Sequence, residues 1–193
     1  MLAVFLDTET SGLDPFIHVP LEIAFVIVDL CTGEELCSYE RMFRISKKEW
    51  EDRDPQSVLI NGFTFEELQK GFSREVVSSE IEEIFLKFQI INERAFFICQ
   101  NPSFDRPFFA TIIDTYRQEV LKMPYHWLDL ASMYWALRGN REQREFGVVV
   151  SKDAIAQVLK LGSEARPHRA MNGAQHLFAC YKELVGFTQE VRK

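Results

Sequence analysis

Apolar residues along this chain follow two spacings, and the first is typical of strands. Short apolar runs rich in β-branched residues cover 2–6 and 21–30, and a third candidate covers about 35–45. The turn signal Thr32-Gly33 separates the second run from the third. These segments are therefore expected to pair as three antiparallel strands.

Helical spacing begins near residue 78 and then alternates with apolar runs. Ile81, Phe85 and Phe88 repeat at intervals that place them on one face of a helix. Further segments with helical or strand character follow in alternation: a strand at 94–100, a helix at about 103–120, a short strand near 127–128, and helices at about 130–138, 152–160 and 167–185. Such alternation is typical of parallel units. The pattern predicts an α/β fold with a five-stranded mixed sheet, three antiparallel strands followed by parallel strands, flanked by helices.

Length and composition favour one globular domain over residues 1–193. Hydrophobic residues make up 47% of the chain and charged residues 26%, the balance of an ordinary folded protein. The apolar N-terminus lacks a basic region and a cleavage site, and charges interrupt every candidate membrane span. A cytoplasmic protein with no membrane partner is expected. Its four cysteines form no CxxC pair, which favours reduced thiols over a zinc site.

The net charge of −7 argues against a protein that coats nucleic acid non-specifically, since that mode depends on Lys and Arg. A cluster of carboxylates that binds cations is itself acidic, so the charge does not exclude a nuclease. The polar segment 139–147 is expected to be a solvated surface loop. The alternative is that Arg141 and Arg144 contact phosphates.

Acidic residues follow two of the predicted strands. Asp7 and Glu9 stand two apart, so their side chains leave one face of a strand and can converge on one hard cation such as Mg²⁺ or Mn²⁺. Solvated acids at a strand end would show the same pattern. Asp105 follows the strand at 94–100, and parallel strands gather their carboxyl ends at one edge. It could join the pair, or it could be only a favourable acid at a helix start.

His168 lies at the predicted start of the last helix, directly after Pro167. A lone histidine is usually structural or exposed. The positive end of a helix dipole favours the neutral imidazole, which can accept a proton from water. His168 is therefore a candidate base.

Three segments resemble the exonuclease motifs of the DEDDh family: Phe5-Leu6-Asp7-Thr8-Glu9-Thr10-Ser11-Gly12-Leu13, Asn101-x-x-Phe104-Asp105-x-x-Phe108 and His168-Arg169-Ala170. The resemblance spans nearly the whole chain and implies a ribonuclease H-like fold. The Asp-Thr-Glu-Thr form is most similar to the proofreading exonuclease subunit of DNA polymerase III and to ribonuclease T. The implied activity is 3′-to-5′ hydrolysis of phosphodiester bonds at single-stranded DNA or RNA ends.

The resemblance also implies residue roles. Asp7, Glu9 and Asp105 would bind two Mg²⁺ or Mn²⁺ ions, and Glu9 and His168 would be catalytic, with His168 deprotonating the attacking water. Five further residues would contact the substrate: Thr10, Gly12, Leu13, Asn101 and Phe104. Phe104 could stack on a base or could pack beneath its helix.

One family carboxylate is missing. The family has an aspartate five residues after the histidine, where this chain has Gly173, and Asp153 is its last aspartate. Asn172 would point elsewhere, because one helical step turns the side chain by about 100°. Either the ligand was lost naturally or it was replaced deliberately. Both imply weaker metal binding and weak or undetectable hydrolysis.

A second hypothesis is therefore a non-catalytic module that binds nucleic acid or accompanies a polymerase and keeps only the exonuclease fold. Family analogy suggests nucleic-acid 3′ ends as one partner, and a DNA polymerase or a second copy of the chain as another.

Overall fold

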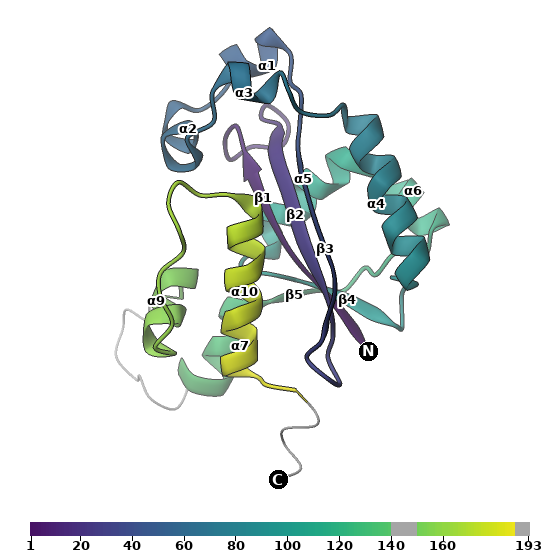
Figure 1. Ribbon diagram of the computed structural model, residues 1–193, viewed down its shortest axis with the longest axis vertical. Helices are drawn as coiled ribbons and strands as arrows, with labels where there is room; N and C mark the ends of the chain where they lie inside the picture. Colours follow the sequence, from purple (N-terminus) through teal and green to yellow (C-terminus); the bar gives the residue numbers. More distant parts are fainter. Residues whose placement is uncertain (140–149, 188–193) are drawn as a thin grey trace.

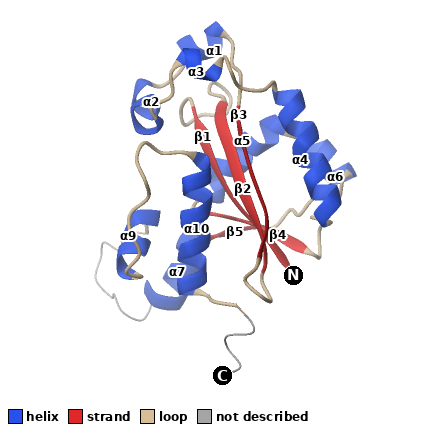
Figure 2. Ribbon diagram, viewed as in Figure 1, coloured by secondary structure: helices blue, strands red, loops and turns tan. Residues whose placement is uncertain are grey.

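The computed structural model describes residues 1–139 and 150–187, and a five-stranded sheet forms its centre (Figures 1 and 2). The strands are β1 (Leu2–Thr10), β2 (Pro20–Asp29), β3 (Glu35–Met42), β4 (Ala95–Cys99) and β5 (Trp127–Asp129). Their order is β3-β2-β1-β4-β5. The first three strands pair antiparallel, whereas β4 and β5 continue the sheet in parallel with β1. The predicted mixed sheet is confirmed.

Helices cover both faces of this sheet (Figure 1). On one side lie α4 (Arg74–Phe88), α5 (Pro102–Ile112) and α6 (Thr115–Val120); on the other lie α7 (Leu130–Tyr134), the π-helix η1 (Trp135–Gly139), α9 (Lys152–Val158) and α10 (Ala170–Leu184). Three short helices lie beyond the end of β1: α1 (Lys47–Glu51), α2 (Pro55–Asn61) and α3 (Phe65–Leu68). The sheet is thus the middle layer of three.

The side chains of β1 alternate between two apolar cores. Val4 and Leu6 pack with α4 and α5, whereas Ala3 and Phe5 pack with α7, α9 and α10. This period of two follows from the pleat of a strand. The same alternation places the next two residues on opposite faces of the sheet. Asp7 faces α10, and the side chain of Thr8 lies on the α5 face.

Two helix boundaries differ from the sequence prediction. The helix expected at 103–120 is divided into α5 and α6, because the carboxylate of Asp114 accepts hydrogen bonds from the N–H groups of Tyr116 and Arg117 and begins a new helix. The last helix begins at Ala170 instead of Pro167. Glu22 on β2 accepts the Ala170 N–H at 2.7 Å and so caps α10.

The segment 139–147, expected to be a surface loop or a phosphate contact, lies almost entirely outside the described residues. Within the part of the chain that is described, no helix is both long enough and apolar enough to span a membrane.

Candidate active site

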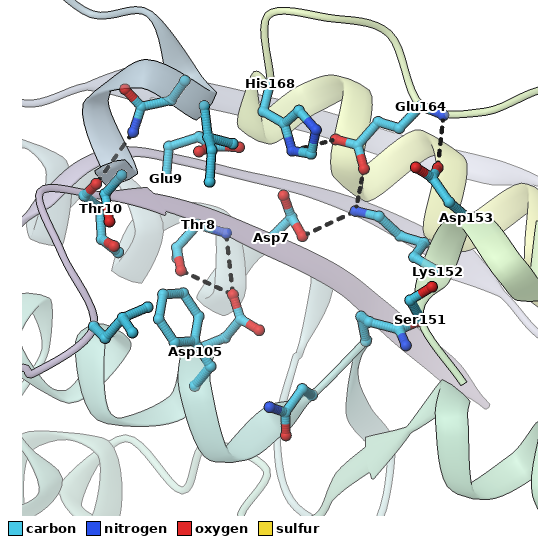
Figure 3. A pocket seen from close by; sticks show the side chains of 17 residues that line it. Asp7, Thr8, Glu9, Thr10, Asp105, Ser151, Lys152, Asp153, Glu164 and His168 are labelled. Carbon is cyan, nitrogen blue, oxygen red and sulfur yellow. Dashed lines mark hydrogen bonds and ion pairs between the residues drawn. The ribbon is translucent and has the colours of Figure 1, made fainter. Parts of the chain in front are cut away.

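A cleft of about 390 Å³ opens where β1 and β4 end (Figure 3). Parallel strands bring their carboxyl ends to the same edge, so residues distant in sequence meet there. The lining side chains include acidic, basic and apolar groups: Asp7, Thr8, Glu9, Thr10, Leu13, Asn101, Phe104, Asp105, Lys152, Asp153, Glu164 and His168. The candidate residues from all three sequence motifs therefore share one cleft.

Asp7 and Glu9 enter this cleft from the face of β1 that α10 covers. Glu9 is 9% exposed, and burial together with the charges of Asp7 and Glu164 raises its pKa to about 8. Burial also raises the pKa of Asp7, while the neighbouring ammonium of Lys152 acts in the opposite direction. The two carboxylates are thus held close together at a considerable electrostatic cost.

Asp105 reaches the cleft from the first turn of α5. Its Oδ1 accepts two hydrogen bonds from Thr8 on β1, one from the backbone N–H at 3.1 Å and one from the hydroxyl at 2.8 Å. Burial, followed by the charge of Asp7, raises the pKa of Asp105 to about 8 despite these bonds. The Thr8 contacts fix this carboxylate against the same strand that carries Asp7.

His168 lies in the loop before α10, outside the helix, because Arg169 is the N-cap. Its backbone N–H donates to the carbonyl of Ile60 at 3.3 Å, which ties the loop to α2. The imidazole Nδ1 is 3.8 Å from Glu164 Oε1. The side chain stands at the wall of the cleft, partly exposed, where a water molecule can reach it.

Lys152 and Glu164 form a buried ion pair that the sequence analysis did not identify. Lys152 Nζ is 2.8 Å from Glu164 Oε2 and 3.3 Å from Asp7 Oδ1, and the Lys152 and Glu164 side chains are 12% and 3% exposed. Burial by itself would lower the pKa of Lys152, but Asp7 and Glu164 outweigh it and raise that pKa. A permanent positive charge therefore stands among the carboxylates.

The side of the cleft at Gly173 is filled by neighbouring groups. A Cβ at this position would collide with Asp7 Oδ2 and would lie 3.0 Å from Lys152 Nζ. Lys152 also donates to the Gly173 carbonyl at 3.4 Å. The space that a fourth family carboxylate would need is occupied by Asp7 and the ammonium.

Four of the five predicted substrate residues line the cleft. Leu13 is 72% exposed. Phe104 is half-buried, and its ring centroid lies 5.2 Å from that of Phe108. Phe104 thus packs on its own helix and also lines the cleft, which agrees with both readings. Gly12 instead packs against His18, whose ring a Cβ at position 12 would overlap.

The missed residues had little signal in the sequence. Glu164 lies four residues before His168, on the opposite side from the family's aspartate position, so the motif spacing does not point to it. Lys152 reads as an ordinary residue of a helix start. Its contact with Asp7 spans 145 positions of sequence, which no local pattern reveals.

The donor set fits a hard divalent cation. Carboxylate oxygens are the ligands that Mg²⁺ and Mn²⁺ prefer. In the described residues, one group of three has ligand atoms that all lie within 4.8 Å of one another: Glu9, Glu164 and His168. Asp7 and Asp105 line the same cleft outside that group.

Comparison with solved structures shows the same fold in nucleases. Cell-death related nuclease 4 superimposes with a TM-score of 0.73 at 13% identity, over 95% of this chain and 63% of that one. Exonuclease I of E. coli, solved with a dT13 oligonucleotide, gives 0.73 at 18% identity, over 98% and 42%. The nuclease domain of 3′hExo, a DEDDh family member bound to rAMP, gives 0.69 at 12% identity, over 93% and 88%.

The chain thus spans less than two thirds of the first two nucleases. No curated protein sequence matches it. At the level of sequence families, residues 4–181 match RNase T, described as exonuclease. This match and the shared fold confirm the resemblance to DEDDh exonucleases, and the chain belongs to the RNase T exonuclease family.

Proposed function

We propose that this chain, as one exonuclease domain, removes nucleotides from the 3′ end of single-stranded DNA or RNA with the help of Mg²⁺ or Mn²⁺. The observation that carries the proposal is the convergence of Asp7, Glu9, Asp105 and His168 in one cleft. These groups come from β1, the first turn of α5 and the loop before α10 (Figure 3). Nuclease chemistry needs such a combination of cation-binding oxygens and a proton acceptor.

Each side chain has a part in this proposal. Asp7, Glu9 and Asp105 would hold the divalent cations, which supply positive charge to the scissile phosphate and to the departing oxygen. His168 would take a proton from the attacking water. The water oxygen then forms a bond to phosphorus, and the bond from phosphorus to the 3′ oxygen of the preceding nucleotide breaks. The products are a nucleoside 5′-monophosphate and a strand shortened by one residue.

Apolar and polar groups beside the carboxylates suit a terminal nucleotide. Phe104 and Leu13 present carbon surface at the cleft, and aromatic side chains commonly stack on unpaired bases. Thr10 is held in place by donating its hydroxyl hydrogen to the Gly12 carbonyl at 2.7 Å. The related exonuclease I and 3′hExo domain were solved with an oligonucleotide and with rAMP, which supports a substrate of this class.

A second candidate function is nucleic-acid binding without hydrolysis. The specific observation behind it is the ammonium of Lys152, which lies 3.3 Å from Asp7 Oδ1 and competes with a cation for that carboxylate. The loss of an aspartate at Gly173 acts in the same direction. A protein of this kind would hold the 3′ end in the cleft but leave the phosphodiester intact.

The two candidates differ in a trimming assay. A single-stranded oligonucleotide labelled at its 5′ end is incubated with excess protein in Mn²⁺ or in chelator, beside the Asp105→Asn variant. We expect a ladder of 3′-shortened products in Mn²⁺ and at least about a 100-fold slower reaction for Asp105→Asn, since losing a ligand exceeds the usual effect of its supporting residues. The amide keeps an acceptor for Thr8, so the fold is preserved. Binding of the oligonucleotide with no ladder would favour the second candidate. Equal ladders from the unaltered chain and from Asp105→Asn would contradict the role of Asp105 as a cation ligand.

A further inference from the structure

Glu164 is the most unusual carboxylate in the cleft. Its side chain is 3% exposed, and its Oε2 binds Lys152 Nζ at 2.8 Å, whereas its Oε1 lies 3.8 Å from His168 Nδ1. Oε1 is buried and has no hydrogen-bond partner among the described residues. A buried charged oxygen without a partner is costly, and its presence in a native fold calls for an unseen water or ion.

Two other groups that can bind a cation lie close to Glu164. Glu9, Glu164 and His168 each present a ligand atom, and these atoms lie within 4.8 Å of one another. Two oxygens on opposite sides of a magnesium ion are about 4.2 Å apart, since each bond is about 2.1 Å long. One divalent cation therefore fits between the two carboxylates.

The surroundings of Gly173 explain why the cation would lie between Glu9 and Glu164 and not beside position 173. In the family the carboxylate after His168 comes from the position of Gly173, but a side chain there would collide with Asp7 and approach Lys152 Nζ. The ammonium of Lys152 stands between Asp7 and Glu164 at that place. A divalent cation beside Gly173 would be repelled by it, whereas the oxygen of Glu164 that contacts the ammonium is Oε2, which leaves Oε1 for a cation.

We propose that Glu164 replaces the missing family aspartate and, together with Glu9, holds a divalent cation beside His168. Lys152 positions the Glu164 carboxylate by binding its second oxygen, Oε2. Asp153 adds to this positioning, since its Oδ1 accepts the backbone N–H of Glu164 at 3.1 Å. The imidazole of His168 then stands next to the cation, where the proposed function requires a proton acceptor. The inference rests on that proposed function and identifies one of its cation sites.

The first test measures Mn²⁺ binding by electron paramagnetic resonance on the whole chain, without substrate. We expect Glu164→Gln to weaken Mn²⁺ affinity by at least about 10-fold, because a ligand is lost while the amide can still accept a hydrogen bond from Lys152. Glu51→Gln is the matched control, since Glu51 belongs to an exposed pair with Lys47 (63% and 80% exposed) and should leave the affinity unchanged. Unchanged Mn²⁺ affinity in Glu164→Gln would overturn the inference.

The same assay separates this inference from the proposed function. If Glu164→Gln binds Mn²⁺ normally while Asp105→Asn does not, Glu164 is not a ligand but the nuclease proposal stands. If Glu164→Gln loses affinity while the unaltered chain never shortens an oligonucleotide, the cation site stands and the nuclease proposal fails.

A second measurement does not depend on the folding of any variant. Crystals of the unaltered chain soaked in Mn²⁺ should give an anomalous difference peak at about 2.2 Å from Glu164 Oε1, the distance expected for a hard cation and a carboxylate oxygen. A peak that contacts only Asp7 and Asp105 would contradict the role of Glu164.

Discussion

The two sides of the cleft hold their carboxylates by different means. On the α5 side, Asp105 accepts two hydrogen bonds from Thr8, both from uncharged donors. On the α9 and α10 side, Asp7 and Glu164 share the ammonium of Lys152. The first side carries the carboxylate that the sequence motif names, whereas the second has a glycine at position 173 with the ammonium of Lys152 beside it.

The difference shows two ways of holding buried carboxylates close together, by neutral hydrogen-bond donors and by a buried ammonium. A lysine near the lost position offsets one negative charge permanently, so a cation is no longer the only means of offsetting the repulsion between carboxylates. Carboxylates still outnumber the ammonium, because Lys152 can balance only one of the five in the cleft lining: Asp7, Glu9, Asp105, Asp153 and Glu164.

Removing the ammonium should have the largest effect on stability. We expect Lys152→Met to lower the free energy of unfolding by about 3 to 5 kcal/mol at neutral pH, since it leaves buried carboxylates without a counter-charge. Urea unfolding in chelator measures the change, and added Mn²⁺ should restore part of it. The control Lys47→Met disrupts an exposed pair and should change stability by less than about 0.5 kcal/mol. Equal losses of stability in the two variants would show that the buried ion pair contributes no more to folding than the exposed pair.

Filling the space at position 173 should have the next largest effect. Gly173→Ala places a methyl group against Asp7, so we expect a loss of about 1 to 3 kcal/mol, as for other overpacked sites. Gly162→Ala is the matched control, because no atom lies within 4 Å of the Cβ it would add. Thermal melts of both variants measure the difference. A Gly173→Ala variant as stable as the control would mean that Asp7 moves aside freely.

The raised carboxylate pKa values predict a pH dependence of stability. The pKa of Glu9 and that of Asp105 are each about 8 in the folded chain, so between about pH 5 and pH 8 the folded state keeps protons that the unfolded state releases. Stability in chelator should therefore fall as pH rises across this window, by about 1.4 kcal/mol per pH unit for each of the two groups. Urea unfolding at several pH values measures the slope, which should flatten in Glu9→Gln. A slope of opposite sign would contradict the assigned burial of these groups.

Restoring the family aspartate should have the smallest effect on the rate of oligonucleotide shortening. In Gly173→Asp the new carboxylate would lie next to Lys152 Nζ and pair with the ammonium, so we expect no gain in the rate of oligonucleotide shortening. The same assay on Gly173→Asp combined with Lys152→Met removes the competing charge, and there a gain is expected. A gain from Gly173→Asp alone would show that Lys152 leaves the site readily.

Much of the fold follows from local patterns. The apolar runs of β1 and β4 predicted the strands, and the spacing from residue 78 predicted α4. The division between α5 and α6 was missed because the apolar pattern continues through it, while the capping carboxylate of Asp114 interrupts the helix. The start of α10 was missed because its cap, Glu22, comes from β2.

The sequence by itself determined the family and the mixed sheet, and it named Asp7, Glu9, Asp105 and His168 as candidates, because these lie in short motifs whose spacing carries the information. Only the tertiary structure decided what surrounds them. Whether a charged group is buried, paired or left with a free oxygen depends on segments that meet only after folding, as β1, α9 and the loop before α10 do at Lys152 and Glu164. The vacancy at Gly173 is visible in the sequence, but the groups that fill it are not.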